Sequence, residues 1–298
     1  MGAEIRHENV DCGGVKLHCA VAGEMRGDAG RPLMLFLHGF PEFWAAWRGP
    51  MQHFAARGWL CVAPDLRGYN LSDKPSEVEA YRAKHLVNDV LALGAHYSKN
   101  EFVLVAHDWG GAVAWGVAIG HPRRLQKLVM INSPHPYLFW RELSNNPAQQ
   151  KASEYMNVFR LPKAERVLSD NGYARLLAAF AHLSPAWRAE LVQAWSQPGA
   201  LTGGLNYYRA SPMYPATAGD PGAAKLRLEA KDFMVRVPTL VLWGERDTAL
   251  LPGLLDGLDA CVPDLKVVRA PDASHWIVHE KPDPVCGEIE KFVGEAHG

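Results

Sequence analysis

Residues 102–119 constrain the fold of this chain more than any other segment. They begin with a short apolar run, pass through Asp108 and two glycines, and end in a second apolar run. This order predicts a buried strand, one residue held in a sharp turn, and a closely packed helix, an arrangement called a nucleophile elbow. Ala106 and Gly110 are the small residues that such a turn requires, and Gly111 lets the helix approach the strand.

Asp108 stands at the turn, where enzymes with this elbow usually carry serine. A carboxylate attacks without first losing a proton, and it is better suited to displacement at carbon than to acyl transfer from esters. The residue type therefore favours an alkyl electrophile as substrate. The alternative is that Asp108 only caps the following helix, because aspartate is a favoured N-cap and complements the helix dipole.

Length and composition predict a globular protein with one large core and an inserted segment. The chain has 298 residues, of which 48% are hydrophobic. Its 31 basic and 32 acidic residues are balanced and form no like-charged run, which argues against nucleic acid or an anionic membrane as partner. No apolar run reaches the roughly 18 residues of a membrane span.

The cysteines and the first residues favour a cytoplasmic location. The five cysteines are scattered and form no C-x-x-C pair, so we expect free thiols in a reducing compartment and neither a disulfide framework nor a zinc cluster. Residues 1–6 lack the apolar stretch of a signal peptide.

Apolar runs and amphipathic segments alternate along most of the chain. Residues 5–23 predict an antiparallel edge hairpin. Unbroken apolar runs predict buried parallel strands at 33–37, 59–63, 102–105, 127–131, 239–243 and 265–268, and helical patterns cover 44–57, 81–97 and 282–295. The alternation predicts a doubly wound, mostly parallel sheet.

The alternation stops over residues 135–230. This stretch is rich in Pro, Tyr, Trp, Arg and Ala, has helical periodicity, and contains no strand-like run. We therefore expect a helical cap at 135–230, inserted into an α/β core made of residues 1–134 and 231–298.

Functional side chains are expected where parallel strands end, because ligands bind at the carboxyl edge of such a sheet. Asp108 follows one strand, Asp247 follows the first strand after the insertion, and His275 follows the last strand. The order nucleophile, acid, histidine is that of a catalytic triad on this kind of sheet.

Two members of this triad have competitors. Glu245 lies two residues before Asp247 and could serve as the acid instead. His279 follows His275 at a spacing that can bind a metal on a helix, but Trp276 occupies the place of the glutamate in H-E-x-x-H. We therefore expect no metal site.

Four motifs together resemble the α/β-hydrolase epoxide hydrolases. They are His38-Gly39-Phe40-Pro41-Glu42, residues 67–75 (RGYNLSDKP), His107-Asp108-Trp109-Gly110-Gly111 and His275-Trp276. The resemblance spans about residues 30–292 and implies the α/β-hydrolase fold with an inserted helical cap. We expect His38 and His107 to be structural. Haloalkane and haloacid dehalogenases share the individual motifs and also use an aspartate nucleophile.

Cap tyrosines distinguish the epoxide hydrolases from these relatives, because two of them donate hydrogen bonds to the epoxide oxygen. The segment 206–209 (NYYR) is similar to the family motif Asn-Trp-Tyr-Arg, which assigns this role to Tyr208 and leaves Tyr207 in the place of the tryptophan. Tyr155 lies at the family's spacing before Phe and Pro. The alternative for either tyrosine is packing on an amphipathic helix.

Two departures from the dehalogenases also favour an epoxide. Phe40 stands where haloalkane dehalogenases often carry the asparagine that holds the halide. Trp109 and Ala112 stand where fluoroacetate dehalogenases carry arginines beside the nucleophile. Haloalkane dehalogenases share Trp109, so that residue does not discriminate.

The resemblance implies hydrolysis of a small apolar epoxide to a vicinal diol through a covalent ester, with no metal, nucleotide or flavin cofactor. Asp108 attacks a ring carbon while Tyr155 and Tyr208 stabilise and protonate the epoxide oxygen. His275, supported by Asp247, then activates the water that hydrolyses the ester.

Phe40 and Trp109 are expected to line the substrate pocket, and their backbone N–H groups are expected to form the oxyanion hole for ester hydrolysis. Two other functions remain open from the sequence. One is a haloalkane dehalogenase that uses the same ester chemistry, and the other is a non-catalytic binding protein with the same fold.

Overall fold

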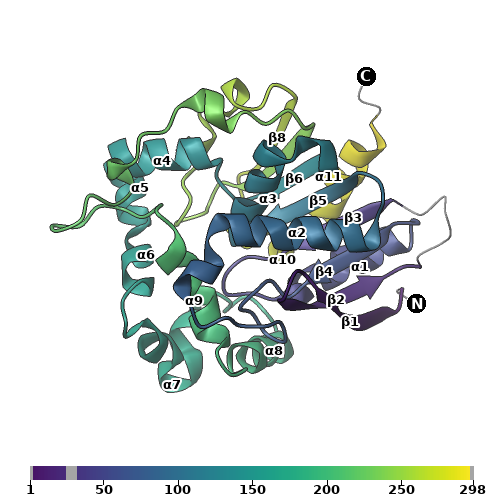
Figure 1. Cartoon of the computed structure of the whole chain (residues 1–298), viewed down its shortest axis with the longest axis horizontal. Helices are drawn as coiled ribbons and strands as arrows, with labels where there is room; N and C mark the ends of the chain where they lie inside the picture. The colour runs from purple at the N-terminus through teal and green to yellow at the C-terminus, as the bar shows by residue number, and fades with distance from the viewer. Residues whose placement is uncertain (1–2, 25–31, 296–298) are drawn as a thin grey trace.

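The computed structural model describes residues 3–24 and 32–295, which form one eight-stranded sheet with helices around it (Figure 1). The strands are β1 (Ile5–Asp11), β2 (Lys16–Ala22), β3 (Leu33–Leu37), β4 (Leu60–Pro64), β5 (Phe102–His107), β6 (Leu125–Ile131), β7 (Thr239–Gly244) and β8 (Leu265–Ala270). Their spatial order is β1-β2-β4-β3-β5-β6-β7-β8.

The pairing confirms the predicted mostly parallel sheet. β1 and β2 form the expected antiparallel hairpin at one edge, and β2 also pairs antiparallel with β4. All pairs from β4 to β8 are parallel. Every residue of β3, β4 and β5 is buried, which explains why unbroken apolar runs marked these strands. The predicted strand bounds agree with the structure to within two residues.

Helices cover both faces of the sheet, as expected for a doubly wound fold. They are α1 (Arg48–Ala55), α2 (Ala83–Tyr97), α3 (Asp108–Gly120), the short α10 (Ile277–Glu280) and α11 (Pro282–Gly294). In Figure 1, α2 and α3 pack together on one face, while α1 and α11 contact each other on the opposite face.

Two predicted helices begin later than expected. The segment predicted as a helix over 44–57 is a 3₁₀ turn at Trp44–Trp47 followed by α1. Pro50 has no N–H to donate to the carbonyl of Ala46, so an α-helical ladder does not run through both parts. The helix predicted over 81–97 begins at Ala83, because Arg82 is extended, with φ −64° and ψ 146°.

Between β6 and β7 the chain adds helices and no strand to the sheet. These helices are α4 (Pro136–Asn145), α5 (Pro147–Ala152), α6 (Glu154–Phe159), α7 (Ala164–Ala178), α8 (Pro185–Trp195) and α9 (Ala200–Ala210). They lie to one side of the sheet in Figure 1. α7 consists of two helical pieces, because the backbone leaves the helical region at residues 170–173.

All five cysteines are free and buried. In the part of the chain that the structure describes, no helix combines the length and the apolar character needed to cross a membrane.

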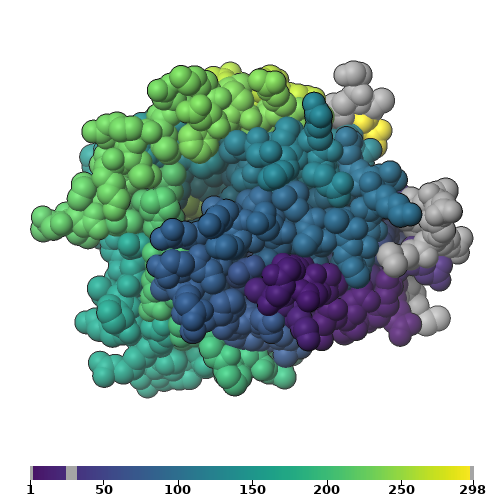
Figure 2. Space-filling model, viewed as in Figure 1, coloured from purple at the N-terminus to yellow at the C-terminus, as the bar shows by residue number. Residues whose placement is uncertain are grey.

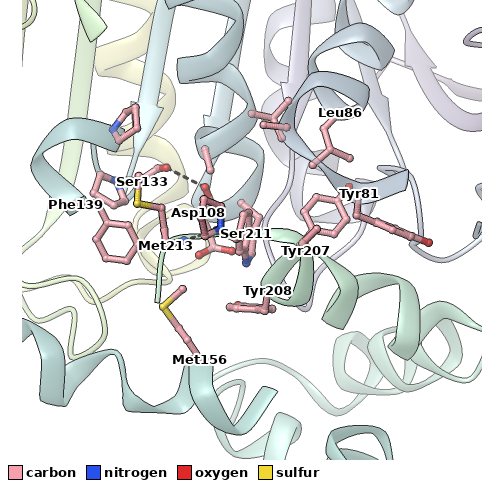
Figure 3. Close-up of a pocket in the computed structure, with 18 of the residues that line it drawn as sticks. Tyr81, Leu86, Asp108, Ser133, Phe139, Met156, Tyr207, Tyr208, Ser211 and Met213 are labelled. Carbon is pink, nitrogen blue, oxygen red and sulfur yellow. Dashed lines mark hydrogen bonds between the residues drawn. The ribbon is translucent and has the colours of Figure 1, made fainter. Parts of the chain in front are cut away.

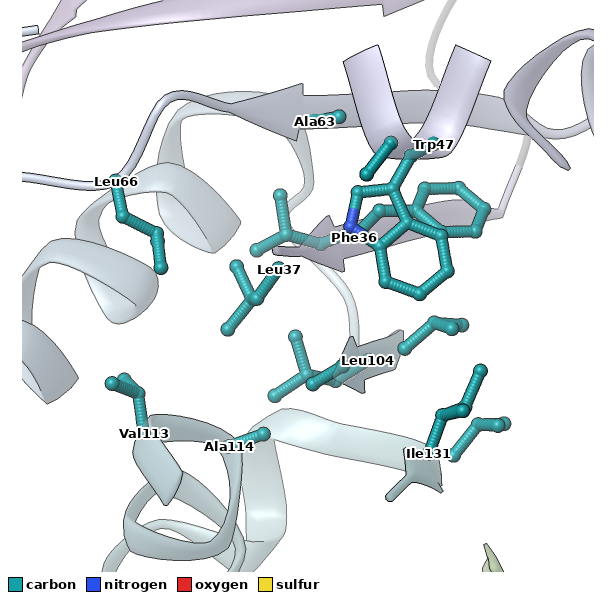
Figure 4. Packing of buried hydrophobic residues seen from close by; sticks show 14 of the residues in the cluster. Phe36, Leu37, Trp47, Ala63, Leu66, Leu104, Val113, Ala114 and Ile131 are labelled. Carbon is teal, nitrogen blue, oxygen red and sulfur yellow. The ribbon is translucent and has the colours of Figure 1, made fainter. Parts of the chain in front are cut away.

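The core beneath the elbow is packed tightly enough to fix the start of α3. Apolar side chains from β3, β5 and α3 fill the interior, with the rings of Phe36 and Trp47 5.3 Å apart (Figure 4). Gly110 lies against the end of β3: a Cβ atom there would stand 2.4 Å from the carbonyl oxygen of Leu37 and 2.6 Å from that of His38. The missing side chain therefore allows α3 to touch the sheet.

Gly110→Ala is expected to lower the free energy of unfolding by roughly 1–3 kcal/mol, because the methyl group collides with backbone atoms and forces a shift in a packed core. Urea denaturation measures this change. Gly120→Ala is the matched control in the same helix, since a Cβ atom there meets nothing within 4 Å. The control is expected to be neutral or slightly stabilising. Equal effects of the two substitutions would contradict the packing argument.

Candidate active site

Asp108 stands at the end of β5 in a conformation that few residues other than glycine adopt. Its φ is +49°, in the left-handed region. Asp108 is the first residue of α3, and the N-cap position before it is held by His107, which makes no side-chain capping bond. Asp108 Oδ1 accepts a hydrogen bond of 2.8 Å from the backbone N–H of Phe40, and the hydroxyl of Ser133 donates to the Asp108 carbonyl at 2.9 Å. These contacts hold the carboxylate above the sheet edge and argue against the capping alternative.

The other two strand ends bring an acid and a histidine to the same place. His275 Nδ1 lies 2.6 Å from Asp247 Oδ2, and His275 Nε2 lies 3.7 Å from Asp108 Oδ2. The imidazole therefore has its Nδ1 side held by one carboxylate and its Nε2 side facing the other. The three residues predicted at separate strand ends lie together.

Asp247, and not its competitor Glu245, contacts the histidine. The backbone N–H groups of Ala249 and Leu250 donate to Asp247 Oδ1 at 2.8 and 2.9 Å, which leaves Oδ2 for the imidazole. Glu245 forms a partly exposed ion pair of 2.9 Å with Arg269. A buried carboxylate with fixed donors is the better orienting group for His275.

Asn132 completes the surroundings of Asp247, and the sequence analysis did not identify it. It is fully buried, has a φ of +37°, and donates from Nδ2 to Asp247 Oδ2 at 2.9 Å. Its amide also exchanges two hydrogen bonds with the backbone of Gly244. Its place directly after β6, at the same edge as the other strand-end residues, is the signal that could have found it.

Their opposite charges stabilise His275 and Asp247 in their ionised forms. Burial alone would lower the pKa of His275, but Asp247, and to a smaller extent Asp108, raise that pKa to about 9. Burial would raise the pKa of Asp247, but His275 and the amide donors lower it. Protonation of His275 thus stabilises the folded protein at low pH, and this contribution is lost as the pH rises from 6.5 through about 9.

A second buried carboxylate, Glu42, lies behind the histidine. His279 Nε2 lies 2.5 Å from Glu42 Oε1, and His107 Nδ1 lies 3.5 Å from Oε2. His107 Nε2 in turn lies 2.9 Å from the carbonyl oxygen of His275. Burial would raise the pKa of Glu42, but the two histidines lower it. His279 therefore pairs with a carboxylate, and no cluster suited to a metal ion occurs among residues 3–24 and 32–295.

The loop after β3 contributes the backbone N–H of Phe40 to the site, but its side chains do not line the large pocket. His38 is structural, as expected, because its Nε2 accepts the N–H of Leu66 at 3.0 Å. The ring of Phe40 packs at 5.3 Å from both Phe159 and Tyr208, and it borders a small second cavity. Phe40 is not among the side chains that line the large pocket, whereas Trp109 is.

The large pocket has a volume of about 260 Å³, and Asp108 is one of the residues that line it (Figure 3). Core helices and the helices between β6 and β7 both supply its walls, and Figure 2 shows a hollow where the blue and green segments meet. Among the described residues that line it, Asp108 is the only charged one. The walls include Leu86, Trp109, Phe139, Tyr155, Met156, Tyr208 and Met213.

Tyr155 on α6 and Tyr208 on α9 both border this pocket, with ring centres 6.2 Å apart. Burial raises the pKa of both phenols, so both carry a proton at neutral pH. Tyr208 also packs edge-on against Trp109 at 5.0 Å. The neighbouring Tyr207 also lines the pocket, but its hydroxyl donates to the carbonyl of Arg67 at 2.9 Å.

Comparison with known proteins defines the family. The profile of the alpha/beta hydrolase fold matches residues 32–282. The chain belongs to this family. It is 36% identical to the AB hydrolase superfamily protein YfhM of Bacillus subtilis, over 93% of this chain and 94% of that protein.

Relatives named epoxide hydrolases confirm the resemblance that the motifs predicted. The chain is 34% identical to mouse Epoxide hydrolase 4, over 95% of this chain and 77% of the relative. A crystal structure of Bacillus megaterium epoxide hydrolase with an inhibitor superimposes with a TM-score of 0.86 at 34% identity, covering 97% of this chain and all of the other. This α/β hydrolase therefore groups with epoxide hydrolases in both sequence and fold.

The charge of Asp108 is expected to contribute to the raised pKa of His275. In an NMR titration, the wild-type imidazole is expected to lose its proton near pH 9, and Asp108→Ala is expected to move that midpoint to lower pH, because a nearby negative charge has been removed. Asp11→Ala, at the end of β1 at the far edge of the sheet, is the control. An unchanged midpoint in Asp108→Ala would contradict the electrostatic argument.

Proposed function

We propose that this protein hydrolyses small apolar epoxides to vicinal diols through an ester on Asp108. The observation that carries the proposal is the geometry of one carboxylate. Asp108 lies on a left-handed elbow and lines an apolar pocket, and its Oδ2 lies 3.7 Å from a histidine that Asp247 orients. The named epoxide hydrolases among the relatives support the substrate class.

In the first step, a carboxylate oxygen of Asp108 attacks one ring carbon of the epoxide. The new C–O bond forms as the ring C–O bond breaks, and the ring oxygen takes a proton from a phenol. Tyr155 and Tyr208 suit this role because both are protonated and border the same pocket. A hydrogen bond to developing charge is stronger in such an apolar site than in water.

In the second step, His275 Nε2 takes a proton from water, and the resulting hydroxide attacks the carboxyl carbon of the ester. The bond between that carbon and the alkyl oxygen then breaks, and the departing alkoxide takes the proton of the new carboxyl group, which frees the diol and restores the Asp108 carboxylate. The proton held by His275 returns to the phenolate left by the first step. The N–H of Phe40, which already contacts Asp108 Oδ1, and the N–H of Trp109 are the donors for the oxyanion. Forming the ester removes the negative charge of Asp108, which lowers the pKa of His275 relative to the free enzyme. The imidazole therefore becomes a better base at the step that needs one.

The helical segment 135–230 acts as a cap in this proposal. It supplies Tyr155 and Tyr208, while the core of residues 1–134 and 231–298 supplies the triad. The pocket favours a neutral, apolar substrate, because a second charged group would have no counter-charge on the walls.

Isotope transfer tests the ester mechanism directly. With enzyme in excess over styrene oxide in H2(18)O, the diol of a single turnover is expected to carry no 18O, because its new oxygen comes from Asp108. The tryptic peptide 100–123 is expected to gain one 18O, measured by mass spectrometry. Asp108→Ala is expected to form no diol. Direct labelling of the first diol would rule out the ester and favour attack by water on the epoxide.

Tyr155→Phe and Tyr208→Phe are each expected to slow alkylation of Asp108 by roughly ten- to a hundredfold, the loss of a hydrogen bond worth about 1.5–3 kcal/mol to a charged group. Rapid-quench mass spectrometry of the intact protein measures the rate of ester formation. Tyr207→Phe is the matched control: Tyr207 also lines the pocket, but its hydroxyl donates to the Arg67 carbonyl and so offers no proton to the epoxide oxygen. If the double variant Tyr155→Phe/Tyr208→Phe alkylates at the wild-type rate, the phenols are packing residues only.

A further inference from the structure

Arg160 follows α6 directly and reaches across to the last turn of α9. Its Nη1 donates to the backbone carbonyls of Tyr208 at 2.5 Å, Arg209 at 3.3 Å and Ser211 at 3.1 Å. The guanidinium carbon lies 3.7 Å from the ring centre of Tyr214. One guanidinium thus donates to the carbonyls of residues 208, 209 and 211 and packs against an aromatic ring.

The carbonyls of Tyr208 and Arg209 belong to the last turn of α9, where a helix leaves its carbonyls unpaired and has the negative pole of its dipole, and Ser211 follows the helix directly. A guanidinium satisfies several of them at once and carries the complementary charge. Tyr208 lies two residues before the end of α9, in the turn that is otherwise most prone to fray. Arg160 therefore stabilises the backbone from which this phenol projects.

The same side chain links Tyr208 to the helix that carries the other phenol. Tyr155 lies five residues before Arg160, in α6. The ring of Phe159 packs against both tyrosines, with ring centres 5.3 Å from that of Tyr155 and 5.1 Å from that of Tyr208. The separation of the two phenols consequently depends on how α6 sits against the end of α9.

We propose that Arg160 is a positioning residue for epoxide opening: by tying α6 to the last turn of α9, it sets the spacing at which two phenols meet one oxygen. This inference rests on the proposed function. Two hydrogen bonds to a single atom are sensitive to small displacements of either donor. A structural bond elsewhere in the cap has no such requirement.

Other polar links in this region end on different groups. Arg209 pairs with Glu165 at the start of α7 at 2.6 Å, and Asn157 donates to the carbonyl of Pro215 at 3.1 Å. These bonds hold the surrounding helices and the loop after α9. Arg160 differs because it binds the carbonyl of Tyr208 itself.

The test is Arg160→Met, which keeps a long apolar side chain and removes every donor. We expect alkylation by styrene oxide in a single turnover to slow by about tenfold to a hundredfold, while hydrolysis of the preformed ester changes less than twofold, because that step uses His275 and not the phenols. Arg160→Lys is expected to fall between the wild type and Arg160→Met. Arg48→Met is the control: the Arg48 guanidinium pairs with Glu190 and, like that of Arg160, lies over an aromatic ring, here Trp187, but it contacts neither phenol.

Epistasis separates positioning from simple loss of stability. In the Tyr155→Phe/Tyr208→Phe background, Arg160→Met is expected to have no further effect on alkylation. Three results would overturn the proposal: that Arg160→Met slows alkylation and ester hydrolysis equally, that it slows alkylation by the same factor in the Tyr155→Phe/Tyr208→Phe background as in the wild type, or that it does not slow alkylation at all. Should Arg160→Met fail to fold, Arg160→Lys in both backgrounds gives the same comparison.

The outcome also distinguishes this inference from the function on which it rests. If Tyr208→Phe slows alkylation and Arg160→Met does not, only the positioning role is wrong. If neither tyrosine substitution slows alkylation, the assignment of the phenols is wrong as well.

Discussion

The close approach of α3 to the end of β3 is the constraint on which the rest of the site depends. A side chain at position 110 would collide with two backbone carbonyls, and one at position 111 would meet Ser133 at 2.3 Å. Because both positions are glycine, Asp108 can occupy a left-handed turn and direct its carboxylate at the N–H of Phe40. Strained backbone of this kind persists only where the surrounding structure holds it. The packed core beneath the elbow supplies that support.

The second organising feature is a balance of buried charge. Asp108, Asp247 and Glu42 lie in a poorly hydrated region, where unpaired carboxylates are costly. His275 lies between the first two, and His279 and His107 flank the third. Each carboxylate is thus met by imidazole or by backbone N–H groups, and the raised pKa of His275 reflects this arrangement. In our proposal, esterification removes the negative charge of Asp108. The pKa of His275 is therefore lowered at the step in which His275 must act as a base.

The two parts of the chain contribute to different chemical steps in this proposal. The sheet supplies the nucleophile, the acid and the base, which are held by strand ends and therefore move little relative to one another. The helices between β6 and β7 supply the two phenols and part of the apolar wall. Their placement depends on contacts between helices, and Arg160 lies at the contact between α6 and α9. Changes in the helical segment can therefore alter substrate activation while leaving ester hydrolysis intact.

The sequence alone determined the sheet, the elbow and the three strand-end residues. It could do so because strands buried on both faces are unbroken apolar runs, and because the elbow needs small residues next to Asp108 in the chain. The tertiary structure decided what depends on residues distant in sequence. Asn132 meets Asp247 across 115 residues, and Arg160 meets Tyr208 across 48. Local pattern also did not show that the hydroxyl of Tyr207 binds a backbone carbonyl, or that Phe40 is not among the residues that line the large pocket. These contacts depend on how helices and loops pack against one another, and the periodicity of the sequence does not indicate that packing.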